Sequence, residues 1–259
     1  MNNTATDKGR LISIDQRGNV MWSSMEGAFY GANPDLIIKA TDTPILTSAT
    51  SMKDMFRGVT NLTGNFANWD TSKITDMSYL FQGGTNFNRP INTWDTSSVT
   101  TMSHMFENAI MFDQALNSWN VGKVKDMSYM FKGAKAFKQA LNSWNTNNAK
   151  TMQEMFQGAI AFNQELSNWD VGNVTNMTSM FDGATIFNKD LKNWCVIQIP
   201  TEPANFATIA LLTGNKPHWG ICETFSGMKP FVMTRRTTAA NEQVYIYGNG
   251  AGYNYTIDW

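Results

Sequence analysis

Met127-Ser-Tyr-Met130-Phe131-Lys-Gly-Ala134 is the segment on which the structural interpretation rests, because its pattern returns every 25 residues along the chain. Three columns of large apolar residues keep the same phase over six repeats. The columns are methionine at positions 52, 77, 102, 127, 152 and 177, phenylalanine at 56, 81, 106, 131, 156 and 181, and tryptophan at 69, 94, 119, 144, 169 and 194. Such repetition is typical of chains in which short structural units stack on one another.

The apolar residues of each unit have the spacing of a short helix. Met127, Met130, Phe131 and Ala134 lie at i, i+3, i+4 and i+7, on one face of an α-helix. Gly or Asn stands just before the last of these positions, and both accept the left-handed conformation that ends a helix. The next apolar segment, up to Trp144, predicts a short strand or an extended turn. The sequence therefore predicts an α/β, leucine-rich-repeat-like solenoid with a short helix in each 25-residue coil.

Three of the repeated columns allow a second interpretation. The Met column either packs in the core or binds a soft metal such as copper(I), and we expect packing because it shares a face with Phe and Ala. The Trp column either is buried or stacks sugars, and its constant phase with the core columns favours burial. The residue after Trp forms either a calcium ladder or a series of turns, and we expect turns. That residue is Asp70, Asp95, Asn120, Asn145 or Asp170.

Composition and motifs exclude several classes of function. The formal net charge is −1 and 16% of the 259 residues are charged, which offers no basic surface for nucleic acid. The chain holds no apolar run long enough to insert into a membrane. Its two histidines, His104 and His218, lack a patterned catalytic partner, and no nucleophile, phosphate-loop or metal-spacing motif is present. We therefore expect no catalytic, cofactor-binding or metal-binding residues.

The pattern breaks at both ends of the repeats. Cys195 and Cys222 bracket a proline-rich segment and either form one disulfide or are two free thiols. We expect the disulfide, which places the chain in an oxidising compartment. Residues 244–247 and 253–257 flank a glycine-rich turn and predict a β-hairpin, the opening of a further β domain.

Trp169-Asp-Val-Gly-Asn-Val-Thr-Asn-Met177-Thr-Ser-Met180-Phe181-Asp-Gly-Ala184 resembles the repeats of the BspA-like leucine-rich-repeat surface proteins. The branch concerned is the Met- and Phe-rich kind found in mycoplasma lipoproteins and many Bacteroidetes proteins. The resemblance covers about residues 25–222. It implies a leucine-rich-repeat-like fold, a place on the cell surface or in the secreted fraction, and a role in adhesion or protein binding.

The flanks also resemble neighbours of such repeats. Residues 231–259 look like the opening of an immunoglobulin-like or PKD-like sandwich, and 10–22 like the last strand of a preceding one. We therefore divide the chain into an N-terminal strand or cap (1–24), a repeat solenoid (25–194), a disulfide-closed cap (195–222) and a truncated β domain (228–259). This organisation implies a longer multidomain chain, whose export signal lies outside the present sequence.

These observations predict a non-enzymatic surface module that binds a protein or glycan ligand. The alternative is a carbohydrate-binding accessory module or part of a carbohydrate-active enzyme. Tyr79, His104 and Tyr129 each lie two residues after the repeat Met, so they are expected to form a row that either binds sugar or shields the coil. Ile110, Met111 and Ile160 are a second candidate, as a protein-contact patch.

Overall fold

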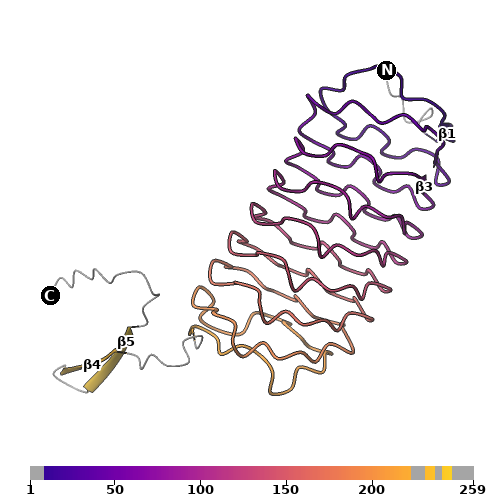
Figure 1. The fold of residues 1–259 in the computed structure, drawn as a ribbon. Coiled ribbons are helices and arrows are strands. Elements are labelled where there is room, and N and C mark those ends of the chain that lie inside the picture. Colours follow the sequence, from indigo (N-terminus) through magenta and orange to yellow (C-terminus); the bar gives the residue numbers. More distant parts are fainter. Residues whose placement is uncertain (1–8, 223–230, 237–240, 247–259) are drawn as a thin grey trace.

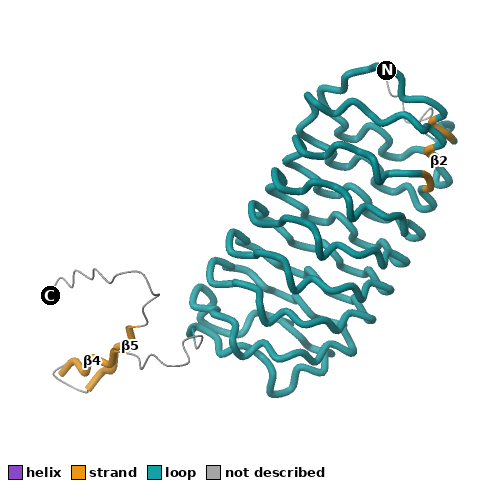
Figure 2. Tube along the Cα trace, in the orientation of Figure 1, coloured by secondary structure: helices purple, strands orange, loops and turns teal. Residues whose placement is uncertain are grey.

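The computed structural model describes residues 9–222, 231–236 and 241–246. Residues 9–222 form an elongated stack of coils that advances steadily from the N-terminus (Figure 1). Turns and irregular segments make up nearly all of this stack (Figure 2). The described residues contain no helix and five short strands, which are β1 (Ser13–Ile14), β2 (Ile37–Ile38), β3 (Thr63–Gly64), β4 (Phe231–Arg236) and β5 (Asn241–Ile246).

Parallel pairing links each coil to the next. β1, β2 and β3 form a small parallel sheet in that order, with Ser13 opposite Ile37 and Ile37 opposite Thr63. Further along the stack, single parallel bridges take over on one side of the coils. They run in one column through Ser51, Asp76, Thr101, Asp126, Thr151 and Asn176.

The predicted helix in each repeat is wrong, and with it the α/β, leucine-rich-repeat-like solenoid. In an α-helix every N–H donates to the carbonyl four residues earlier. In the segment 102–109, however, the N–H groups of Met102, His104 and Phe106 donate to carbonyls of the next coil at 2.9–3.0 Å. The intervening N–H groups of Met105 and Glu107 each close a β-turn to the carbonyl three residues earlier, both at 3.2 Å. Each repeat therefore contains a ribbon of successive β-turns, which we call the turn ribbon.

The turn ribbon reproduces the spacing of an amphipathic helix. Its inward residues fall at i, i+3, i+4 and i+7, as Met102, Met105, Phe106 and Ala109 do, and all four are fully buried. The backbone differs at the third residue of alternate turns, where φ is positive, as in a type II turn. The first such position of each turn ribbon holds a residue other than glycine, with φ between 53° and 61°, namely Asp54, Tyr79, His104, Tyr129, Glu154 and Ser179. The second holds glycine in every ribbon but one, where it is Asn108.

The core consists of columns of aromatic and methionine side chains. Successive Phe rings stack across coils, with centroids 5.6 Å apart for Phe106–Phe131 and Phe131–Phe156. The predicted Trp column is confirmed, since Trp119 and Trp144 are 3% and 2% exposed and Trp144 stacks on Trp169 at 6.1 Å. The Met column is buried among these rings, which confirms the packing interpretation.

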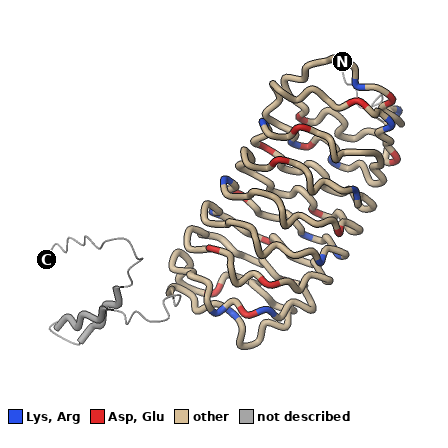
Figure 3. The backbone as a smooth tube through the Cα atoms, in the orientation of Figure 1, with Lys and Arg blue, Asp and Glu red and all other residues tan. Residues whose placement is uncertain are grey.

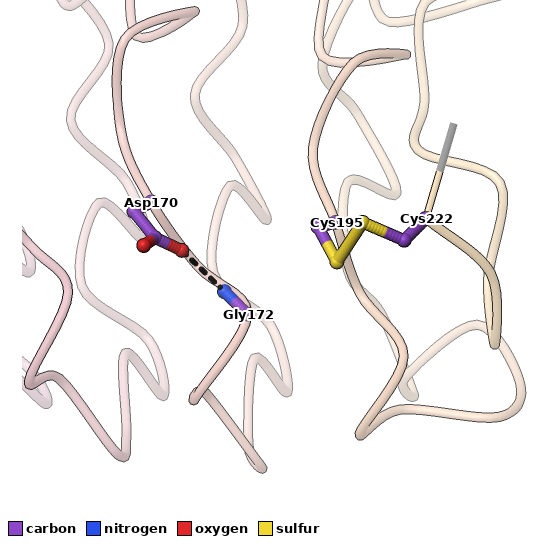
Figure 4. The surroundings of a disulfide bond; sticks show 4 residues. All are labelled: Asp170, Gly172, Cys195 and Cys222. Atoms are coloured by element: carbon purple, nitrogen blue, oxygen red, sulfur yellow. Dashed lines mark hydrogen bonds between the residues drawn. A yellow bond between two sulfur atoms is a disulfide. The ribbon is translucent and has the colours of Figure 1, made fainter. Parts of the chain in front are cut away.

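The Asp/Asn column forms turns, as predicted. The Oδ1 atom of Asp170 accepts a 3.0 Å hydrogen bond from the N–H of Gly172 (Figure 4). Asp70, Asp95, Asn120 and Asn145 accept the equivalent bond from the amide two residues on. Within the part of the chain that the structure describes, no group of three or more His, Cys, Asp or Glu residues is arranged to hold a metal ion.

The C-terminal end of the stack departs from the repeat. Cys195 stands where the preceding repeats have Asp or Asn, and it forms the predicted disulfide with Cys222 (Figure 4). Phe206 packs its ring edge-on against Trp219 at 4.8 Å. Further along, β5 overlaps the strand expected at 244–247, and its described partner is the antiparallel β4. The other expected strand, 253–257, lies outside the described residues.

Candidate functional site

Three rings that lie 25 residues apart in the sequence meet on one face of the stack. The His104 ring lies between Tyr79 and Tyr129, with centroid distances of 4.3 and 4.2 Å and interplanar angles of 9° and 8°. All three side chains are partly buried. We call Tyr79, His104 and Tyr129 the aromatic row. The structure thus brings the sequence-predicted binding residues together.

The aromatic row occupies strained backbone. Its residues have φ values of 60°, 58° and 61°, which are unfavourable for residues with a bulky side chain. The neighbouring coils hold this conformation, because the N–H groups of Tyr79, His104 and Tyr129 donate to carbonyls of the next coil at 2.8–2.9 Å. Glycine would occupy the same positions without strain. Strained backbone is often found at functional sites, so three bulky rings in succession at such positions mark a candidate site.

Cations cover both ends of the aromatic row. The guanidinium of Arg57 lies 5.0 Å from the centre of the Tyr79 ring and 5.6 Å from that of Tyr30. At the other end, Nζ of Lys132 lies 5.3 Å from the centre of the Tyr129 ring. These distances are those of cation–π contacts. The outward faces of the two tyrosines are therefore not free surfaces.

Two carboxylates fix the row from the side. Oε2 of Glu107 lies 2.6 Å from Nδ1 of His104 and accepts a 2.5 Å hydrogen bond from Nε2 of Gln82. Oε2 of Glu154 pairs with Nζ of Lys132 at 2.5 Å. Burial by itself raises the pKa of Glu107, but hydrogen bonds from His104 and Gln82 and the charges of His104 and Lys132 outweigh it. The pKa of Glu107 therefore lies below its ordinary value, and the group is ionised at neutral pH.

The hydroxyl of Tyr129 is also held in place. It accepts a 2.6 Å hydrogen bond from Nε2 of Gln153. Burial, followed by the nearby charge of Glu154, raises the pKa of Tyr129 above its ordinary value. The phenol therefore stays neutral at neutral pH, and its O–H can donate to the carboxylate of Glu154.

The second candidate patch lies where each coil turns back. The side chains of Met111 and Ile160 are 52% and 45% exposed, and Ile110 is partly exposed. The N–H of Ala136 donates to the carbonyl of Ile110 at 3.0 Å, so neighbouring coils are hydrogen-bonded to each other along this edge. Ile186 is 45% exposed and belongs to the same edge. The patch predicted from the sequence did not include it, although it lies three repeat lengths after Met111.

Charged residues of both signs are distributed along the stack. Lys and Arg positions (blue) and Asp and Glu positions (red) are interspersed along the described coils in the view of Figure 3. Many of them pair with each other, as Lys138 does with Asp113 and Lys189 with Glu165, both at 2.9 Å. Within the described ranges, no helix has the length and apolarity to cross a membrane.

Comparison with known proteins identifies a family and nothing further. No curated protein and no solved structure matches the chain. The family model described as "Mycoplasma protein of unknown function, DUF285" matches residues 23–140 and 114–219, which together span the stacked coils. The chain therefore belongs to the DUF285 family of mycoplasma proteins.

Proposed function

We propose that this chain is a non-enzymatic binding module, displayed at a cell surface or secreted, that presents the aromatic row to a protein ligand. The observation that carries the proposal is the succession of three bulky rings at positive φ, where glycine is the less strained choice. This strained backbone carries the aromatic row, which lies at the surface and is fixed by ion pairs on both sides. Rigid aromatic residues with adjacent charges are characteristic of protein-binding hot spots.

The geometry of the row favours a protein over a sugar. A sugar binds an aromatic residue by lying on the face of the ring. Here Tyr79 and Tyr129 each turn one face to His104 and the other to a cation, Arg57 or Lys132. What the row offers a ligand is ring edges, hydroxyl groups and the flanking carboxylates. Such a surface suits polar and cationic side chains of a protein.

Two further observations support a place outside the cytoplasm. The Cys195–Cys222 disulfide is a feature of chains that fold in an oxidising compartment. The resemblance of the repeats to those of BspA-like surface proteins implies the same location. Detection of the disulfide in protein isolated from its native cells, with accessibility to an impermeant label, tests this placement.

The binding proposal is tested by probing the chain in parallel on an array of extracellular host proteins and on a glycan array. His104→Gly removes the central ring and suits the backbone, since glycine accepts φ of 58°. Ser179→Gly makes the same backbone change three coils further on, outside the row. We expect protein hits that weaken about tenfold or more with His104→Gly, as for loss of a hot-spot residue, and that persist with Ser179→Gly.

Two results would contradict the proposal. Hits confined to the glycan array would restore the carbohydrate alternative. Protein hits that survive His104→Gly but are lost with Met111→Ser and Ile160→Ser would move the binding surface to the apolar edge of the coils.

A further inference from the structure

One edge of the stack changes from polar to apolar part of the way along. The position concerned lies where the coil turns back, directly before a buried residue of the core. In two successive coils it holds asparagine, and Nδ2 of Asn86 donates to Oδ1 of Asn61. In the five coils that follow, the residue 25 positions on is always apolar, namely Met111, Ala136, Ala161, Ile186 and Leu211. We call these five residues the apolar strip.

The large members of the apolar strip are open to solvent. Met111, Ile186 and Leu211 are 52%, 45% and 59% exposed, and the two alanines between them are partly exposed. Ile160, 45% exposed, widens the strip beside Ala161. Single exposed apolar residues are common on protein surfaces, whereas a contiguous group of them indicates a contact surface. The polar asparagines at the same position in the preceding coils show that the fold itself does not require an apolar residue there.

The coils beneath the strip keep a constant spacing. Successive Phe rings lie 5.6 Å apart from Phe131 to Phe156 and again from Phe156 to Phe181. The stack advances evenly through this region (Figure 1). A surface with a constant repeat fits best against a surface with the same repeat, and a second copy of this chain has that repeat. The spacing therefore favours a second copy as the partner of the strip.

We propose that two copies of this chain associate through their apolar strips, antiparallel to each other, about a two-fold axis that passes beside Ala161. A two-fold interface brings the same patch of both copies together, and it is the commonest arrangement in homo-oligomers. In this register Ile186 of each copy meets Ala136 of the other, so a large side chain meets a small one. Met111 of each copy meets Leu211 of the other at the ends of the strip.

The residues beside the strip favour the same register. Ile160 meets Ile160 of the second copy at the axis, and Lys135 meets Thr185, so the lysine charge faces a polar group. A shift by one coil in one direction would set Lys135 against Ile160, which removes water from a charge without giving it a partner. A shift in the other direction would leave Met111 beyond the end of the second strip. One register is therefore preferred.

The length of the strip sets the strength of the association. Neighbouring coils joined by β-bridges lie about 4.8 Å apart, so five coils span about 20 Å. A contact of this size falls short of the roughly 800 Å² per partner that stable complexes bury. We therefore expect a reversible dimer with a dissociation constant on the order of 10–100 µM.

Sedimentation velocity of the full chain between about 5 and 500 µM brackets that constant. Ile160→Asp and Ile160→Lys each place two like charges across the axis, so each variant alone should dimerise about tenfold or more weakly. An equimolar mixture of the two should recover the dimer, because residue 160 of one copy then faces the opposite charge of the other.

The matched control is Ile197→Asp, which introduces the same charge at a residue that is 50% exposed but lies three residues after Trp194, away from the strip. It should dimerise as the parent does. His104→Gly should also dimerise as the parent does, so this result is separate from the test of the aromatic row. Thermal melts check that each variant is folded, and exposed positions should leave the melting temperature nearly unchanged.

Three results would overturn the proposal. The parent chain could stay monomeric up to about 500 µM, well above the expected constant. The dimer could survive both single variants at residue 160, which would place the contact on another surface. The single variants could lose the dimer without recovery in the mixture, which would exclude an axis beside Ala161.

Discussion

Nε1 of Trp119 donates a 3.1 Å hydrogen bond to the backbone carbonyl of Ile91, which lies in the preceding coil. The bond is buried, and the same one forms from Trp94, Trp144, Trp169 and Trp194. Each Trp therefore fills the core and also fixes the register between two coils. Stability in such a stack comes from contacts between neighbouring units.

Trp119→Ala should lower the free energy of unfolding by about 3–5 kcal/mol, because it empties a large buried site. Trp119→Phe keeps most of the volume but leaves the Ile91 carbonyl without its donor, so it should cost about 1–3 kcal/mol. Urea titration of the two variants and the parent measures both costs. Equal costs would mean that packing contributes little beyond the hydrogen bond.

Gly158 tests the turn ribbon. Its φ is +68°, and a Cβ added there would meet nothing closer than 3.8 Å, so the cost of a side chain is purely conformational. Gly158→Ala should destabilise the chain by about 1–2 kcal/mol. Gly158→Asn should be milder, since Asn tolerates this conformation and Asn108 already holds the equivalent position with φ of 57°. Thermal melts of both variants measure the difference, and an Asn variant no more stable than the Ala variant would contradict this account.

Glu107 should make stability depend on pH. Because its pKa is lowered in the folded chain, its contribution is complete above the unfolded value of about 4.3 and is lost as pH falls through the folded value. Glu107→Gln should therefore lower the melting temperature at neutral pH, and the difference from the parent should shrink as the pH is lowered below about 4.3. Glu165→Gln, at a side chain that is 59% exposed, is the control and should change little. A Glu107→Gln difference that is independent of pH would contradict the assignment.

The disulfide should stabilise the last coil by about 3–4 kcal/mol, the loop-entropy estimate for its closed loop. Intact mass with and without reductant detects the bond, and melting under the same conditions measures its effect. Cys195→Asp with Cys222→Ser restores the turn residue of the earlier repeats. It should melt above Cys195→Ala with Cys222→Ser, because Asp can bond the amide two residues on, as Asp170 does. Identical melts of the two double variants would show that the column has no turn-forming role at this position.

Much of the core followed from the repeat period. The burial of Trp119 and Met102, the turn at Asp170 and the Cys195–Cys222 bond were all predicted, since each depends on residue type and spacing. The aromatic row followed from the period as well, because residues 25 apart lie side by side in stacked coils. The period did not predict that Arg57 and Lys132 cover the outer faces of the row. Long, flexible side chains adopt positions that depend on the neighbouring residues of the folded surface.

The sequence by itself determined which side chains point inward, because the period of 25 and the spacing i, i+3, i+4 and i+7 set one face against the core. The tertiary structure alone decided the backbone that carries them. A helix and a ribbon of β-turns bury the same residues, and they differ in where the N–H groups of Met102, His104 and Phe106 donate. Those hydrogen bonds go to the next coil, so they exist only once the coils have stacked. The buried Nε1 of Trp69 lacks the hydrogen bond that the later Trp residues make, because the coil before it differs from the repeats that follow.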